Sequence, residues 1–227
     1  MIEKVVLFDS GPLINLSSNG LLYIIERLKS QFSGKFIIPH SVKHEVVDRP
    51  LGVKRFELGA LRVQNLIEKK ILELPESLNL KEEEIKNKTR EFMEKANHAV
   101  MIRGKWVNIV SEAEMACLAI SSILSKQNIK SIIAIDERTT RILSEKPESL
   151  ELLMSKKLHQ NIKLQSPDLE IFKGFQFIRS PELVYVAYKK GLLNLKGKKV
   201  LEAALYATKF KGSAVSFEEI EQLRKLG

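Results

Sequence analysis

Two apolar runs that each end in an aspartate, KVVLFD at residues 4–9 and SIIAID at residues 131–136, decide the fold. Each run predicts a buried strand, because large and β-branched apolar residues fill it without a helical period. KFII at residues 35–38 has the same character, and residues 162–164 form a weaker fourth candidate. Segments long enough for a helix separate these runs, which is typical of parallel strands with covered faces. The sequence therefore predicts an α/β fold with a central parallel sheet.

Capping signals indicate where two of the helices begin. Ser111 and Glu114 match a capping box, and the residues that follow are apolar on nearly every side, which predicts a buried helix. Ser41 is the expected cap of a shorter helix that runs through Val47 and stops near Pro50.

Changes in composition divide the chain. Residues 81–105 are rich in charge and poor in large apolar side chains, so we expect a charged surface helix inserted in the main domain. A second change follows near residue 166, after which Ser180-Pro181 begins a helix that Gly191 ends. We therefore expect an α/β domain over residues 1–166 and a helical C-terminal extension over residues 167–227.

The net charge is +9, from 37 Lys and Arg against 28 Asp and Glu. This balance favours a polyanionic partner such as nucleic acid, although Lys- and Glu-rich proteins from hot environments carry similar surfaces for other reasons. The single Cys117 cannot form an internal disulfide, and neither a signal peptide nor an apolar run of membrane-spanning length occurs. We expect a cytoplasmic protein with no membrane partner.

Several enzyme classes lack their motifs in this sequence. His40, His44 and Glu45 lie together, but their order is not that of the zinc peptidase motif HExxH. The chain has no glycine-rich phosphate loop, no GxGxxG after the first strand and no GxSxG. Zinc peptidases, ATPases, dinucleotide enzymes and α/β hydrolases therefore do not fit.

Four acidic residues stand where a folded core would least tolerate a charge. Asp9 and Asp136 directly follow predicted strands, and ligand sites of open parallel sheets lie beyond the carboxyl ends of the strands. Glu45 lies beside the apolar stripe of its helix, and Glu112 opens the buried helix. Converging carboxylates repel one another unless a cation joins them, and Mg²⁺ or Mn²⁺ suits oxygen ligands. We expect a metal centre built from these four acids.

Each acid also has a simple structural explanation. Asp9 and Asp136 can each cap the turn or helix that follows, since Asp is a favoured cap. Glu112 can complement a helix dipole, and Glu45 can be a solvated residue on a short surface helix. All four simple roles would have to coincide at two strand ends and two apolar helix faces, so the metal centre is the favoured interpretation.

Four segments in this order, FDSGPLINL, IIPHSVKHEVVD, VSEAEMACLAI and IIAIDERTTRIL, resemble the PIN domain family of metal-dependent ribonucleases. The resemblance covers residues 4–165 and implies a three-layer αβα fold around the parallel sheet. Glu112 stands where many members have an aspartate, and Glu114 competes for this third place, but its role in the capping box favours Glu112. The catalytic and metal-binding acids of the family then correspond to Asp9, Glu45, Glu112 and Asp136.

The resemblance implies a metal-dependent endoribonuclease that hydrolyses RNA phosphodiesters with Mg²⁺ or Mn²⁺. The family includes toxin ribonucleases of prokaryotic toxin–antitoxin pairs and nucleases that process ribosomal RNA. An antitoxin-like protein and a second copy of the chain are therefore candidate partners. The C-terminal region is similar to extensions of archaeal relatives. Two alternatives stay open: a PIN-like module that binds RNA or protein with little or no catalysis, and a nuclease that acts on structured DNA.

Basic and hydroxyl side chains near the acids are candidates for RNA binding. Arg138 and Arg141 closely follow the fourth acid, and Ser10 follows the first, so these three are the expected substrate-binding residues. An alternative is that Arg138 pairs with Glu137.

A basic stretch near the C-terminus contains aromatic residues. Single-stranded RNA binds to surfaces that combine positive charge with aromatic rings. A solvated helix with aromatic residues in the core explains the same pattern and is the favoured interpretation. The residues concerned are Lys196, Lys198, Lys199, Lys209 and Lys211, with Tyr206 and Phe210.

Overall fold

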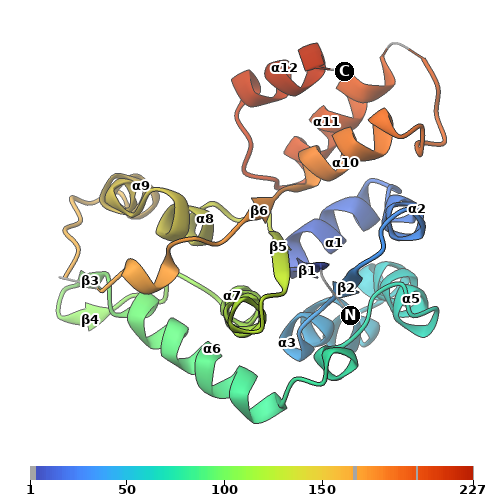
Figure 1. Ribbon diagram of the computed structural model, residues 1–227. Helices are drawn as coiled ribbons and strands as arrows, with labels where there is room; N and C mark the ends of the chain where they lie inside the picture. Colours follow the sequence, from blue (N-terminus) through green and yellow to red (C-terminus); the bar gives the residue numbers. More distant parts are fainter. Residues whose placement is uncertain (1–3, 166–167, 198, 227) are drawn as a thin grey trace.

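The fold is described by a computed structural model over residues 4–165, 168–197 and 199–226 (Figure 1). Its centre is a parallel sheet with the strand order β2-β1-β5-β6. The α/β class and the parallel sheet predicted from the sequence are therefore confirmed. The strands are β1 (Lys4–Phe8), β2 (Lys35–Ile37), β5 (Lys130–Ala134) and β6 (Phe177–Ile178).

The register of the two central strands brings their carboxyl ends to the same edge of the sheet. Phe8 of β1 is paired with Ala134 of β5, and the Asp9 amide donates to the Ala134 carbonyl at 2.9 Å. The residues that follow these strands therefore leave the sheet side by side.

Three of the expected strands are present to within one residue, but the fourth prediction is wrong. Leu164 forms only an isolated antiparallel bridge with Val100. The fourth strand is instead β6, which pairs with the edge of β5. A strand of two residues has no periodicity of its own, and only the free edge of β5 defines it.

Helices cover the sheet on both sides (Figure 1). The crossover from β1 to β2 contains α1 (Ser10–Ser18) and α2 (Tyr23–Ser30), and α7 (Glu112–Lys126) precedes β5. The crossover to β6 contains α8 (Arg138–Glu145) and α9 (Leu150–Leu158). Crossovers between parallel strands are right-handed. Along the strand order β2-β1-β5-β6, the chain crosses the sheet in one direction from β1 to β2 and in the opposite direction from β2 to β5. The helices of these two crossovers, α1 and α7, therefore lie on opposite faces of the sheet. This arrangement is consistent with three layers.

The predicted capping box and buried helix are confirmed in α7. The Glu114 amide donates to Ser111 Oγ at 3.2 Å, and Glu114 Oε2 accepts from the Ser111 amide at 3.3 Å. Ten residues of α7 are buried, and they lie on all sides of the helix.

The segment after β2 differs from the prediction. It consists of α3 (His40–Lys43), a π-helical turn η1 (His44–Asp48) and α4 (Arg49–Leu51), followed by α5 (Lys54–Glu68). Ser41 lies inside α3, whose N-cap is Pro39, so the expected cap is wrong. The helical run ends at Leu51, one residue after Pro50, so the predicted stop near Pro50 is confirmed. Asp48 and Arg49 keep helical dihedral angles, so Pro50 lies in the last turn of a continuous helical run, directly after the π-helical turn η1.

The charged segment forms α6 (Glu82–Asn97), which lies after a short turn η2 (Pro75–Leu78) and before a hairpin of β3 (Met101–Ile102) and β4 (Lys105–Trp106). The expected helix is present, and its outer face is charged. Its inner face buries Ile85, Phe92 and Ala96, and α6 packs along α7. The segment therefore covers the main core as well as presenting a surface.

In the described part of the chain after β6, the helices are α10 (Ser180–Lys189), α11 (Val200–Phe210) and α12 (Phe217–Leu226). We call residues 180–226 the C-terminal unit; it has a small core of its own made by Leu201, Leu205, Val215 and Ile220. The expected boundary falls at residues 166 and 167, which lie outside the described residues. Beyond it, β6 still belongs to the sheet, and Phe172 and Val184 belong to the main core.

Within the described residues, no helix combines the length and the hydrophobicity needed to cross a membrane.

Candidate functional site

Asp9 is a buried carboxylate at the carboxyl end of β1. Only 4% of the residue is exposed, and it is the N-cap of α1. Its Oδ2 accepts a hydrogen bond from the Gly11 amide at 3.2 Å. Its Oδ1 is buried and has no hydrogen-bond partner among the residues that the structure describes. An unsatisfied buried carboxylate oxygen is costly, so the cap explains one oxygen of Asp9 and not the other.

Two further carboxylates act on Asp9. The pKa of the Asp9 carboxyl is raised to about 7, mainly by burial and then by the charges of Glu114 and Glu45. The Cys117 thiol beneath them has its pKa raised well above the usual value by burial first, and then by the charges of Asp9, Glu114 and Glu45. These three acids therefore influence the same buried groups electrostatically; we call them the acid cluster.

Glu45 and Glu114 come from different helical elements. Glu45 is half-buried on the π-helical turn η1, and such turns are often found at functional sites. Glu114 lies in the first turn of α7, and its Oε2 accepts from both the Ser111 amide and Thr140 Oγ1, the latter at 2.6 Å. Because both bonds go to the same oxygen, Oε1 can bind another ligand.

Glu137 supports the acid cluster from α8. It is the N-cap of this helix, where its carboxylate accepts from the Thr139 amide and from the Thr140 amide at 3.2 Å. Burial is the main cause of the raised pKa of Glu114. The hydrogen bond from Thr140 lowers this pKa, and the charge of Glu137 raises it. Glu137, rather than Asp136, therefore has the capping role that the sequence offered as an alternative.

Asp136 lies next to Asp9, but its carboxylate is fully engaged. A Cβ added to Gly11 would lie 3.4 Å from both Asp136 Cβ and Asp9 Oδ2, so the two acids flank the same glycine. Asp136 Oδ1 accepts from the Ser180 amide at 2.9 Å and from Ser213 Oγ at 2.7 Å. Its Oδ2 accepts from Ser180 Oγ at 2.6 Å and from Asn15 Nδ2 at 3.2 Å. These bonds hold the C-terminal unit on the edge of the sheet.

Asp136→Ala is expected to destabilise the protein by about 3 kcal/mol, because it leaves several buried donors without an acceptor. The free energy of unfolding in urea measures this loss. Asp48→Ala is a matched control, since Asp48 is exposed and its ion pair with Lys43 lies at the surface. Equal stability of the two variants would show that the Asp136 bonds do not hold the C-terminal unit.

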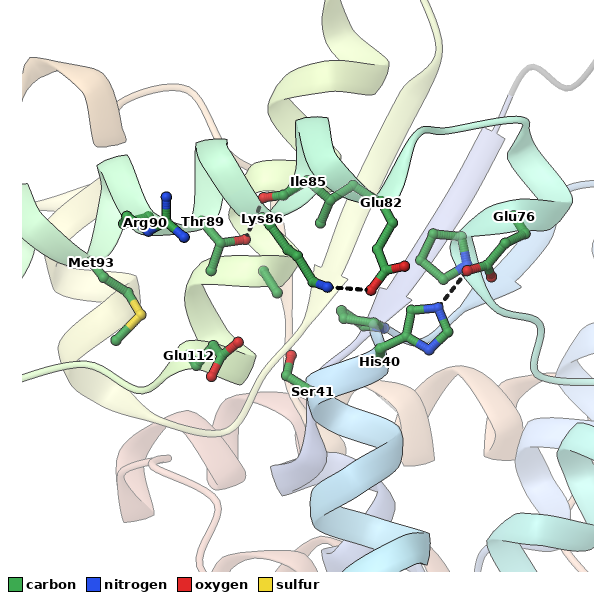
Figure 2. Close-up of a pocket in the computed structure, with 13 residues that line it drawn as sticks. His40, Ser41, Glu76, Glu82, Ile85, Lys86, Thr89, Arg90, Met93 and Glu112 are labelled. Carbon is green, nitrogen blue, oxygen red and sulfur yellow. Dashed lines mark hydrogen bonds and ion pairs between the residues drawn. The ribbon is translucent and has the colours of Figure 1, made fainter.

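Glu112 lies apart from the acid cluster. It is exposed at the first position of α7 and faces a pocket that it shares with Ser41 and Lys86 (Figure 2). The structure therefore brings together Asp9 and Glu45 of the four predicted acids and places Asp136 beside them in a hydrogen-bonded role. It places Glu112 in the neighbouring pocket.

The expected substrate-binding residues have different surroundings. Ser10 is the first residue of α1 and lies directly beside Asp9. Arg138 is exposed at the start of α8. Arg141 forms an ion pair with Glu145, one turn along the same helix, at 3.1 Å. Arg138 is therefore more accessible to solvent than Arg141.

Of the two aromatic residues of the basic stretch, Tyr206 packs on a core and Phe210 does not. Phe210 is 72% exposed, so the favoured interpretation of a core aromatic is wrong for this residue. Tyr206 is half-buried on the small core of the C-terminal unit, and its ring stacks on Phe210 with the centroids 6.1 Å apart. Lys198 lies outside the described residues. RNA binding by this stretch stays a prediction.

The acid cluster can be tested for its fit to a divalent cation. Among the residues that the structure describes, no group of three or more His, Cys, Asp or Glu side chains is already arranged to hold a metal ion. Asp9 Oδ1, which is unpartnered in the described part of the chain, and Glu114 Oε1, to which no hydrogen bond is donated there, nevertheless suit a hard cation. Asp136 does not suit a cation, because both of its carboxylate oxygens already accept hydrogen bonds. Glu112 does not either, because it lies in the neighbouring pocket. Asp9, Glu45 and Glu114 are therefore the residues that fit.

No protein-family model, curated protein or solved structure matches the chain. The resemblance to the PIN domain family rests on the order of the quoted motifs.

Proposed function

We propose that the chain is a divalent-metal-dependent endoribonuclease of the PIN type, with Asp9, Glu45 and Glu114 as the residues that hold Mg²⁺ or Mn²⁺. The observation that carries this proposal is the buried, unpartnered Asp9 Oδ1 with two further carboxylates around it. A structural aspartate would be hydrogen-bonded through both oxygens, as Asp136 is in the same protein.

The position of the acid cluster supports a reaction centre. Asp9 lies at the carboxyl edge of the parallel sheet, where open α/β sheets place their ligands. The chemistry that a bound Mg²⁺ or Mn²⁺ supplies is polarisation of the scissile phosphate and activation of water. Since no three ligands are already in place, at least one carboxylate has to rotate toward Asp9 when an ion binds.

The neighbouring residues have positioning roles in this proposal. Thr140 and the Ser111 amide fix Oε2 of Glu114 and leave Oε1 without a hydrogen bond among the described residues. Asp136 holds Asn15 and two serines of the C-terminal unit, and these contacts fix the wall beside Asp9. The exposed Arg138 and the net charge of +9 favour an RNA phosphate.

A cleavage assay tests this function. End-labelled single-stranded RNA, and DNA of the same sequence, are incubated with the full chain in Mg²⁺, in Mn²⁺ or with a chelator. We expect internal cuts in the RNA only with metal, leaving 5′-phosphate and 3′-hydroxyl ends. Intact RNA with tight binding would favour a binding module, and preferential cleavage of DNA would favour the structure-specific nuclease.

A binding module without catalysis is the second candidate. The saturated hydrogen bonds of Asp136 favour it, because one of the four acids implied by the resemblance is not free to hold a metal. An antitoxin-like partner, a homodimer and a cytoplasmic location stay predictions under either function.

A further inference from the structure

A pocket of about 430 Å³ lies between α3, η2, α6 and the beginning of α7 (Figure 2). This volume is within the range of pockets that bind small organic ligands. Part of its lining is apolar and comes from Ile85, Met93 and Ala116. A flat, partly apolar ring can therefore enter it.

The polar groups of the pocket point to a particular kind of ligand. Figure 2 shows that the Glu112 carboxylate, the Ser41 hydroxyl and the Lys86 amine point toward a common space. Ser41 Oγ is buried and has no hydrogen-bond partner within the described ranges. Lys86 is held by Glu82, with Nζ and Oε1 2.6 Å apart. The pocket thus offers a carboxylate acceptor beside a hydroxyl and an ammonium that donate.

We propose that this pocket binds the guanine base of single-stranded RNA, an inference that rests on the proposed function. The Watson–Crick edge of guanine presents two adjacent N–H donors and then a carbonyl acceptor. The two N–H groups match the two oxygens of Glu112, and the carbonyl matches Ser41 Oγ or Lys86 Nζ. Uracil and adenine do not present two adjacent donors, and cytosine has a single exocyclic amino group beside two acceptors. Bases of single-stranded RNA are commonly recognised on this edge.

The pocket and the acid cluster share two elements. Ser41 and Glu45 are four residues apart on the continuous helical segment of α3 and η1. Glu112 and Glu114 both lie in the first turn of α7. Glu112 and Glu114 are two residues apart and point to different sides of α7, whereas Ser41 and Glu45, four residues apart, lie on one side of their helical segment. We therefore expect the pocket to select a nucleotide close to the cut through the side of α3 and η1 that carries Ser41 and Glu45.

Binding of short RNA to the full chain in the presence of a chelator tests the pocket without catalysis. The probes are a fluorescent oligouridylate and the same oligomer with one guanosine or one adenosine in place of a uridine. We expect the guanosine oligomer to bind about tenfold more tightly than either other oligomer, because a bidentate contact discriminates by this order of magnitude. Equal affinity for the three oligomers would overturn the proposal.

Glu112→Gln provides the decisive variant, because it keeps the size of the side chain and replaces one acceptor oxygen by a donor. The preference for guanosine is expected to disappear in this variant and to persist in Glu83→Gln, a matched control on the exposed face of α6. A retained preference in Glu112→Gln contradicts the proposal.

Cleavage separates this proposal from the proposed function. Glu112→Gln is expected to cut an RNA that lacks guanosine as fast as the wild type does, while losing its advantage on guanosine-containing RNA. A loss of cleavage on both RNAs would make Glu112 a metal ligand and overturn the pocket. A guanosine preference in binding without any cleavage would sustain the pocket and refute the nuclease.

Discussion

Asp9→Asn is expected to lower the rate of RNA cleavage on the order of a thousandfold, while RNA affinity changes by no more than a few-fold. Asparagine keeps the shape of the side chain and the bond with the Gly11 amide, but it lacks the negative charge that holds a divalent cation. Single-turnover cleavage in Mn²⁺, with binding of the same RNA in a chelator, measures the two effects separately.

Asp168→Asn is the matched control for this experiment. Asp168 lies on the surface and pairs with Lys95 at 2.7 Å, so its loss removes one charge far from the acid cluster. We expect wild-type cleavage from this control. Cleavage by Asp9→Asn at the control rate would exclude Asp9 as a metal ligand.

Asp9→Asn is also expected to stabilise the metal-free protein at about pH 8, by up to about 4 kcal/mol. The pKa of Asp9 is about 7 in the folded protein against an ordinary value of 3.8. A raised pKa in the folded state means that the wild type has its full stability below about pH 4 and loses stability as pH rises through about 7. The variant has no such carboxyl, so its advantage grows over this pH range and vanishes below it.

Urea unfolding of both proteins between about pH 4 and about pH 8, in a chelator, measures this difference. Addition of Mn²⁺ at about pH 8 is expected to stabilise the wild type and not the variant, because only the wild type binds the ion. A constant difference in stability over the whole pH range would mean that Asp9 is not held at a raised pKa.

The sheet could be predicted from the sequence because its three longer strands have strong apolar runs. Val5 to Phe8 are all buried, and a run of this kind fits only a strand with covered faces. The two-residue strand β6 could not be predicted, since it depends on the edge of β5 and not on its own sequence.

Only part of the acid cluster can be predicted from the sequence. Asp9 and Glu45 were found from a strand end and an apolar helix face. The capping box gives Glu114 another role and thereby favours Glu112 from sequence alone, but that role uses a single carboxylate oxygen of Glu114. Helical periodicity does not distinguish Glu112 from Glu114 as the metal ligand, because α7 is buried on all sides and both residues lie next to apolar residues.

The role of Asp136 depends on contacts that local spacing does not reveal. Its donors are Asn15, Ser180 and Ser213, which come from α1 and from the C-terminal unit. Motif order places an aspartate after a strand, but it does not tell whether a metal or a set of hydroxyl and amide groups neutralises the carboxylate.

Anomalous X-ray scattering from crystals of the full chain grown with Mn²⁺ tests the central claim most directly. We expect a manganese peak within bonding distance of Asp9 Oδ1, with Glu45 and Glu114 as the other protein ligands. The peak is expected to be absent in Asp9→Asn and retained in Glu112→Gln. A peak bound by Glu112 or Asp136 without Asp9, or no peak in the wild type at saturating Mn²⁺, would contradict the proposed site.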